Sequence, residues 1–163
     1  MTRRALLACG VLLTLLATGC GVRPSDVITG RPAVSGQAQG TGLYLLAEGE
    51  LVLVLRPAPQ DASPASTLAL LAAGPQENER SQGFTSEVPA GFDAVTVTSG
   101  ADRSGGLTVR TTGPARSLSS KAADQIICTV ADAAGRSGLA ESFAPVTIVG
   151  SDGARPARPC PIS

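Results

Sequence analysis

The sequence predicts an α+β domain, with a mostly antiparallel sheet of about five strands, two main helices packed on one face of the sheet and one additional short helix. Three observations support this prediction. The expected strands come mainly in hairpin pairs, which favours antiparallel pairing, and two stretches with helical periodicity stand apart from them. The apolar residues are also almost entirely aliphatic, with one Tyr, three Phe and no Trp among 163 residues.

The first hairpin is expected in residues 43–55. Apolar residues fill 43–47 and 51–55, and the glycine-bearing triplet Glu48-Gly49-Glu50 separates them. This pattern is typical of two strands joined by a turn. Arg56-Pro57 ends the second strand, because proline has no N–H to donate to a sheet.

A helix is expected next, in residues 63–72. Ser63 is a favourable N-cap residue, and Pro64 suits the first helical position. Alanine and leucine side chains then recur on one helical face, and Gly74-Pro75 ends the helix. Residues 76–82 are polar and are expected to form the short helix at the surface.

The second hairpin and the longest helix follow. Residues 94–98 and 107–111 alternate apolar and polar side chains, with the glycine-rich loop 100–106 between them. Residues 118–134 carry an apolar stripe at helical spacing, and two serines at its start can cap the helix. Residues 145–149 form the last strand that the sequence predicts.

Residues 1–19 are expected to be the signal peptide of a bacterial lipoprotein, with Cys20 as the lipidated residue. Arg3-Arg4 gives a positive start, and the 13-residue apolar stretch 5–17 has the length of a signal segment and is too short to span a membrane. The residues up to Cys20 read Leu-Ala-Thr-Gly-Cys, which is similar to a lipobox. A diacylglyceryl group and a further acyl chain such as palmitate on Cys20 would anchor the chain stably at the outer face of the cytoplasmic membrane. An ordinary signal peptide with an unused cysteine is the alternative.

The mature chain is expected to have three parts. Residues 20–42 are rich in Gly, Pro, Ser and Gln without periodicity and should form a flexible tether; an extra strand near Val27-Ile28 is the alternative. Residues 43–150 form the folded domain, and residues 151–163 form a C-terminal tail.

Cys128 and Cys160 are expected to form a disulfide. They remain after Cys9 leaves with the signal peptide and Cys20 takes up lipid, and disulfides persist outside the cytoplasm. The apolar stripe of the long helix places Cys128 near the opposite face, where a surface tail could reach it. Two free thiols are the alternative. A redox or metal pair is disfavoured because the chain has no CxxC motif and no histidine.

The sequence contains no evident catalytic group. The absence of histidine removes Ser-His-Asp and Cys-His machinery and most zinc and copper sites. We therefore expect no enzyme activity, no cofactor and no metal. A solvated or structural role is expected for the remaining polar clusters, which are Ser119-Ser120-Lys121, Glu48 with Glu50, the glycine-rich residues 102–106, and Glu77, Glu79 and Arg80 on the short helix. A partner contact on the short helix is the alternative.

The charge balance disfavours a nucleic-acid partner. Without residues 1–19, the chain has eleven basic against thirteen acidic residues, a net charge of −2. It has no basic run and no interleaved aromatic residues, the features that phosphate backbones and bases recruit.

The order of motifs resembles the GerMN (sporulation and spore germination) domain over about residues 43–150. That domain has a helix with a Gly-Pro break, a following threonine and strand, a second helix that begins near a glutamine, and a closing strand. Short actinobacterial lipoproteins of this shape also end in Arg-x-Cys-Pro. The residues that carry the resemblance are Leu70-Leu71-Ala72-Ala73-Gly74-Pro75, Glu79, Gly83, Thr85, Val88-Pro89, 124–130, 143–148 and Arg158-Pro159-Cys160-Pro161.

The resemblance implies a non-catalytic module that mediates protein–protein interaction or assembly in the cell envelope. GerM-type proteins of spore formers take part in assembling envelope complexes, and the domain is similar to ring-building modules that pack side by side. An envelope protein is therefore the expected partner, bound on the uncovered sheet face or an open strand edge. A lipoprotein that binds a small ligand or a cell-wall component is the alternative. The chain has a single copy of the domain, so its oligomeric state does not follow from the resemblance.

Overall fold

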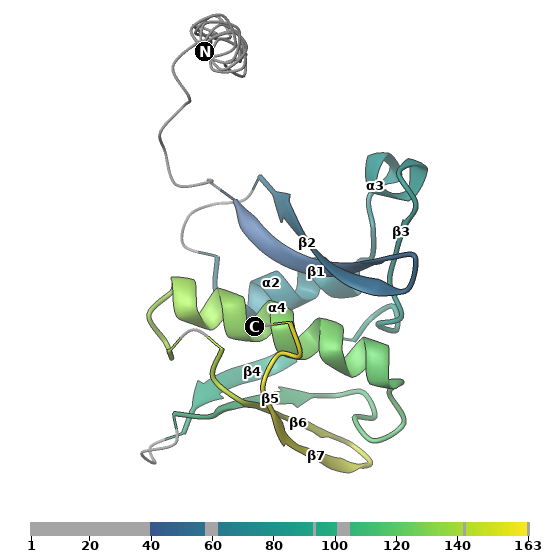
Figure 1. Ribbon diagram of the computed structural model, residues 1–163. Helices are drawn as coiled ribbons and strands as arrows, with labels where there is room; N and C mark the ends of the chain where they lie inside the picture. Colours follow the sequence, from purple (N-terminus) through teal and green to yellow (C-terminus); the bar gives the residue numbers. More distant parts are fainter. Residues whose placement is uncertain (1–39, 58–61, 93, 101–104, 142, 163) are drawn as a thin grey trace, which may run out of the picture. The chain divides into compact units, whose positions relative to one another are not determined.

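Two sheets and three helices make up the described part of the chain, residues 40–57, 62–92, 94–100, 105–141 and 143–162 of the computed structural model (Figure 1). All of these residues belong to one structural unit. In chain order the elements are β1 (Thr41–Ala47), β2 (Glu50–Arg56), α2 (Pro64–Ala72), α3 (Glu77–Ser81), β3 (Phe84–Thr85), β4 (Ala94–Ser99), β5 (Leu107–Thr111), α4 (Ser120–Arg136), β6 (Val146–Gly150) and β7 (Gly153–Arg158).

The two long helices lie between the two sheets. One sheet has the strand order β2-β1-β3 and the other β4-β5-β6-β7. Helix α2 contacts β1 and β4, and α4 contacts β1 and β6, so each helix touches both sheets (Figure 1). The predicted α+β class is confirmed, but the prediction of one five-stranded sheet with helices on one face is wrong.

The strand pairing explains this difference. Both predicted hairpins form, but they do not pair with each other, because α2 packs between β1 and β4. Strands β5 and β6 pair in parallel, with α4 as the crossover between them, whereas the other pairs are antiparallel. Each hairpin thus covers its own side of the helical layer.

Serine side chains start both long helices, as the sequence predicts. The Ser63 hydroxyl accepts the N–H of Ser66 at 3.1 Å with Pro64 at the first helical position. The Ser119 hydroxyl accepts the N–H of Ala122 at 3.0 Å. These bonds satisfy N–H groups that have no partner within the helix.

The core is aliphatic and centres on α4. The predicted stripe of this helix is buried, but so are Gln125, Cys128 and Thr129 on its other sides. A helix that is buried almost all round needs apolar neighbours in more than one direction. Outside α4, the largest fully buried apolar side chains of the core are Leu43, Leu45, Leu68, Leu71, Leu107, Val109, Val146 and Ile148.

Residues 153–158 form a strand where the sequence predicts only a tail. This strand, β7, pairs with β6 and contains Pro156, which a terminal strand tolerates because one side of it needs no N–H. The Arg155 side chain donates to the carbonyl of Leu118 at 2.5 Å and so fastens β7 to the segment before α4. No helix in the described ranges is long and apolar enough to cross a membrane.

Candidate functional site

The β1–β2 hairpin closes through a two-residue turn. Glu48 and Gly49 both have positive φ, 52° and 81°, the backbone conformation that matches the twist of two antiparallel strands. All seven residues of β1 pair with β2, from Thr41 opposite Arg56 to Ala47 opposite Glu50. Glu48 and Glu50 therefore take part in the turn region, and Glu50 forms only an exposed ion pair with Lys121 at 3.5 Å.

Side chains of α4 close the edge of β1 that faces away from β2. The N–H of Tyr44 donates to the Thr129 hydroxyl at 3.0 Å, and the Gln125 amide donates to the Tyr44 carbonyl at 2.9 Å. The Gln125 carbonyl oxygen accepts the N–H of Glu87 at 2.9 Å. Two side chains one helical turn apart thus take the place of a neighbouring strand, which satisfies backbone groups that are buried from water.

The hydrogen bonds of Tyr44 determine which residues of β2 direct their backbone N–H and C=O groups away from β1. Tyr44 points its N–H and C=O away from β2, so Leu53, which lies opposite it, points its own away from β1. The alternation along a strand gives Leu51 and Leu55 the same orientation. Because β2 is a terminal strand, these three residues present their backbone groups along an edge that has no strand partner within the described residues.

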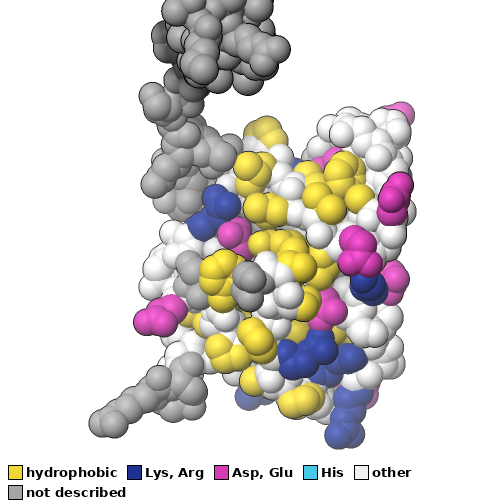
Figure 2. All heavy atoms as spheres, in the orientation of Figure 1, with side chains coloured by type: hydrophobic (Ala, Val, Ile, Leu, Met, Phe, Trp, Pro, Cys, Tyr) yellow, Lys and Arg dark blue, Asp and Glu magenta, His cyan; other side chains and the backbone are white. Residues whose placement is uncertain are grey.

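The same three leucines give this edge an apolar face. Cross-strand neighbours share a face, so Leu51, Leu53 and Leu55 lie on one side of the sheet with Tyr44 and Leu46. Leu53 is 41% exposed and Leu55 is 42% exposed. Figure 2 shows hydrophobic side chains gathered over the surface that β1 and β2 form. We call the outward backbone and leucines of residues 51–55 the β2 edge.

A buried ion pair fixes the end of β2 on its opposite face. The Arg56 guanidinium donates to the Glu79 carboxylate at 2.8 and 2.5 Å and to the carbonyl of Gly74 at 2.8 Å. Hydrogen bonding from Arg56, reinforced by the N–H of Gln76, lowers the pKa of Glu79 below its ordinary value of 4.5. The expectation that Glu79 lies on a polar surface face is wrong, since the residue is 4% exposed.

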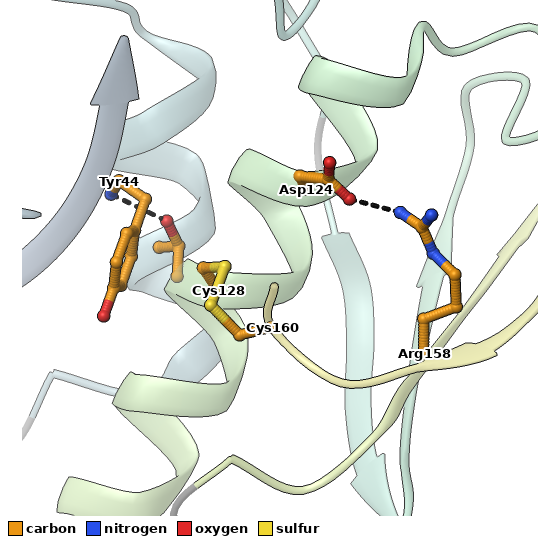
Figure 3. The surroundings of a disulfide bond; sticks show 6 residues. Tyr44, Asp124, Cys128, Arg158 and Cys160 are labelled. Carbon is orange, nitrogen blue, oxygen red and sulfur yellow. Dashed lines mark hydrogen bonds and ion pairs between the residues drawn. A yellow bond between two sulfur atoms is a disulfide. The ribbon is translucent and has the colours of Figure 1, made fainter. Parts of the chain in front are cut away.

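Cys128 and Cys160, which the sequence predicts as a pair, are joined by a disulfide in the structure. Both are buried, and the bridge fastens the segment after β7 to α4 (Figure 3). Arg158 and Asp124 form an ion pair next to the disulfide. In Figure 3, Tyr44 lies on one side of the disulfide and this ion pair lies on the other. Burial and the nearby carboxylate of Asp132 raise the pKa of Tyr44 above 10.

The other polar residues that the sequence singled out do not converge. Ser119 caps α4 and also donates to Glu87, while Lys121 reaches only Glu50. Glu77 and Arg80 are exposed on α3, where Arg80 donates to the carbonyl of Pro75. Cys20 and residues 102–104 lie outside the described residues. Within the ranges that the structure describes, no group of three or more Cys, Asp or Glu side chains could hold a metal ion.

The described surface includes two small depressions beside the helices. One, of about 180 Å³, lies between β6, β7 and α4, and its lining includes Ile127, Ile148 and Arg155. The other, of about 40 Å³, includes Thr67 and Ala133. Both volumes lie below the roughly 300–1,000 Å³ of ordinary small-molecule sites. We take the β2 edge as the candidate site because it combines exposed leucines with outward backbone groups.

Neither family models nor known proteins assign this chain to a group: no family model matches the sequence, and no curated protein or solved structure matches it. The sequence itself contains a signal for the β2 edge. Residues 51–55 are all apolar, whereas a strand covered on one face only would alternate apolar and polar residues.

Proposed function

We propose that this protein is a lipoprotein, anchored through Cys20 at the outer face of the cytoplasmic membrane, whose GerMN-like domain is a non-catalytic interaction module of the cell envelope. The N-terminal motif supports the anchor, since a positive start, a short apolar stretch and a small residue before cysteine are what lipoprotein export and lipidation require. The Cys128–Cys160 bridge is compatible with this placement, because disulfides persist in oxidising compartments.

The β2 edge is the observation that carries the interaction role. It combines outward backbone donors and acceptors with exposed leucines, and an extended segment of a partner protein can bind such an edge by adding a strand. A long, apolar terminal strand is costly for a protein that stays alone, because it invites aggregation. Binding of a protein partner is the role that this surface fits.

The anchor is tested by replacing the lipidated residue. Cys20→Ala should move the protein from the membrane fraction to the soluble fraction and abolish its labelling by radioactive palmitate, with the melting temperature of the domain unchanged. Continued labelling, or retention of the variant in washed membranes, would contradict the lipid anchor.

The interaction role is tested by comparing two lysine variants in membrane complexes. Leu53→Lys places a charge on the β2 edge, and Val95→Lys places the same charge on β4, where Val95 is 61% exposed. After mild cross-linking in intact cells, the wild-type protein and the Val95→Lys variant should each be recovered in the same complexes. The Leu53→Lys variant should not be recovered in them. If all three proteins give the same complexes, or none, the β2 edge is not the interaction surface.

A further inference from the structure

We propose that the occupant of the β2 edge is a second copy of this chain, whose β2 pairs antiparallel with the first about a two-fold axis at Leu53. This inference rests on the proposed interaction role of the edge and names its partner. The reasons lie in the residue order of β2, in its backbone orientation and in the protection of the other terminal strands.

The residue order of β2 makes it complementary to itself. Residues 51–55 read Leu-Val-Leu-Val-Leu in both directions, with Glu50 before them and Arg56 after them. Antiparallel pairing centred on Leu53 sets leucine opposite leucine and valine opposite valine. It also sets Glu50, whose side chain is 83% exposed, opposite Arg56 of the second copy, so no like charges face each other.

The backbone orientation supports the same register. Leu51, Leu53 and Leu55 all point their N–H and C=O outward. Centring on Leu53 pairs Leu51 with Leu55 of the second copy, Leu53 with Leu53, and Leu55 with Leu51. Each is a hydrogen-bonded pair with two bonds, roughly six in total. Shifting the strands along each other would leave outward groups at the ends without a partner.

The side chains on both faces gain contacts in this arrangement. The exposed Leu53 and Leu55 join the corresponding leucines of the second copy in one continuous apolar face. On the other face Val52, which is 37% exposed, meets Val54 of the second copy. The contact thus removes from water the exposed apolar side chains that distinguish this strand.

The other terminal strands in the described part of the chain are protected against such pairing. Strand β4 has an irregular register between Ala94 and Thr96 and offers threonine and serine side chains. Strand β7 carries Pro156 and two arginines, and β3 has only two residues. Bulges, proline, charge and shortness are the devices by which proteins block strand addition. Strand β2 has none of them between Leu51 and Leu55.

Single cysteines test both the dimer and its register. In a hydrogen-bonded antiparallel pair the two Cα atoms lie about 5.5 Å apart, within reach of a short bifunctional thiol reagent. Full-length Leu53→Cys in membranes should therefore give a covalent dimer. Leu51→Cys and Leu55→Cys alone should not, because the proposed register separates each from its own copy by four residues, about 13 Å along the strand. Co-expressed together, these two variants should cross-link to each other.

Matched variants make the result decisive. Val95→Cys is at least as exposed as Leu53→Cys and should remain monomeric. In sedimentation of the detergent-solubilised full chain, Leu53→Lys should weaken self-association at least tenfold, while Val95→Lys should leave it unchanged. Equal cross-linking at positions 51, 53, 55 and 95, or a wild-type protein that sediments as a monomer at every concentration, would overturn the dimer.

The failure of the dimer is distinguishable from failure of the interaction role. The wild-type protein could be monomeric while the Leu53→Lys variant still loses a membrane complex. That result would leave the interaction role in place and show that a different protein occupies the β2 edge. If complexes are insensitive to Leu53→Lys and no dimer forms, both proposals fall.

Discussion

The buried ion pair between Arg56 and Glu79 makes a quantitative prediction for the variant Glu79→Gln. This change removes the carboxylate charge but keeps the size of the side chain. The Arg56 guanidinium then stays buried beside an uncharged amide, with the carbonyls of Leu70 and Gly74 as its remaining acceptors. Removing one partner of a buried pair costs about 3–5 kcal/mol, because the other charge is left without compensation.

We expect a loss of about 3 kcal/mol, at the low end of that range, because Arg56 keeps two carbonyl partners. Urea unfolding of the full chain at pH 7 should show this loss as a lower midpoint, by roughly 1–3 M urea for an ordinary slope of about 1–3 kcal/mol per M. The double variant Arg56→Met/Glu79→Leu is the control. It removes both charges together and should recover most of the lost stability.

The pH dependence provides an independent check. The folded pKa of Glu79 lies below the unfolded value of 4.5, so the stability from this group is fully present above pH 4.5 and is lost as the pH falls toward the folded pKa. Below pH 4.5, the stability difference between wild type and Glu79→Gln should therefore shrink by about 1.4 kcal/mol per pH unit. A difference that stays constant down to pH 3, or a loss below about 1 kcal/mol at pH 7, would refute the role given to the ion pair.

Three further predictions concern contacts that hold the folded domain together. Cys160→Ser should cost about 3–4 kcal/mol in urea unfolding, because Cys128 and Cys160 are 32 residues apart; an unfolding curve that reduction of the wild type does not alter would contradict this. Thr129→Val should cost about 1–3 kcal/mol, because it leaves the buried N–H of Tyr44 without its acceptor, whereas Thr147→Val on β6 should change the melting temperature little. Gly150→Ala should cost about 2–3 kcal/mol or prevent folding, because a Cβ there would lie 2.4 Å from the backbone of Gly113 and Ala115; a wild-type melting temperature would show that the strand can shift to admit it.

Local sequence features predicted most of the elements, although the segment that forms β7 was expected to be part of a tail. The Ser63-Pro64 start, the Gly-Pro stop and the Glu48-Gly49 turn depend on residues only a few positions apart, and the structure contains each of them. Periodicity also identified the buried stripe of α4. The lipid anchor, the GerMN resemblance and the interaction role stay proposals.

The arrangement of the elements depends on contacts that no local pattern encodes. Nothing in residues 94–111 shows that their hairpin packs across α2 from β1. The composition of α3 suggests a solvated helix, yet Arg56, 23 residues earlier in the chain, buries Glu79. Gln125 similarly lies outside the predicted apolar stripe of α4, and its burial is explained only by its partner, the Tyr44 carbonyl 81 residues away.

The closure of β1 by Gln125 and Thr129 determines what kind of assembly this sheet can enter. A strand sheet that is open on both sides can extend without limit and form fibres. In this sheet the edge of β1 that faces away from β2 is covered by the two residues of β3 and by side chains of α4. A further strand can therefore be added only at β2. Once β2 is occupied, no long strand of this sheet is left to extend it. If β2 pairs as we propose, the helix would limit growth to a closed complex of defined stoichiometry, which is the property that separates assembly from aggregation.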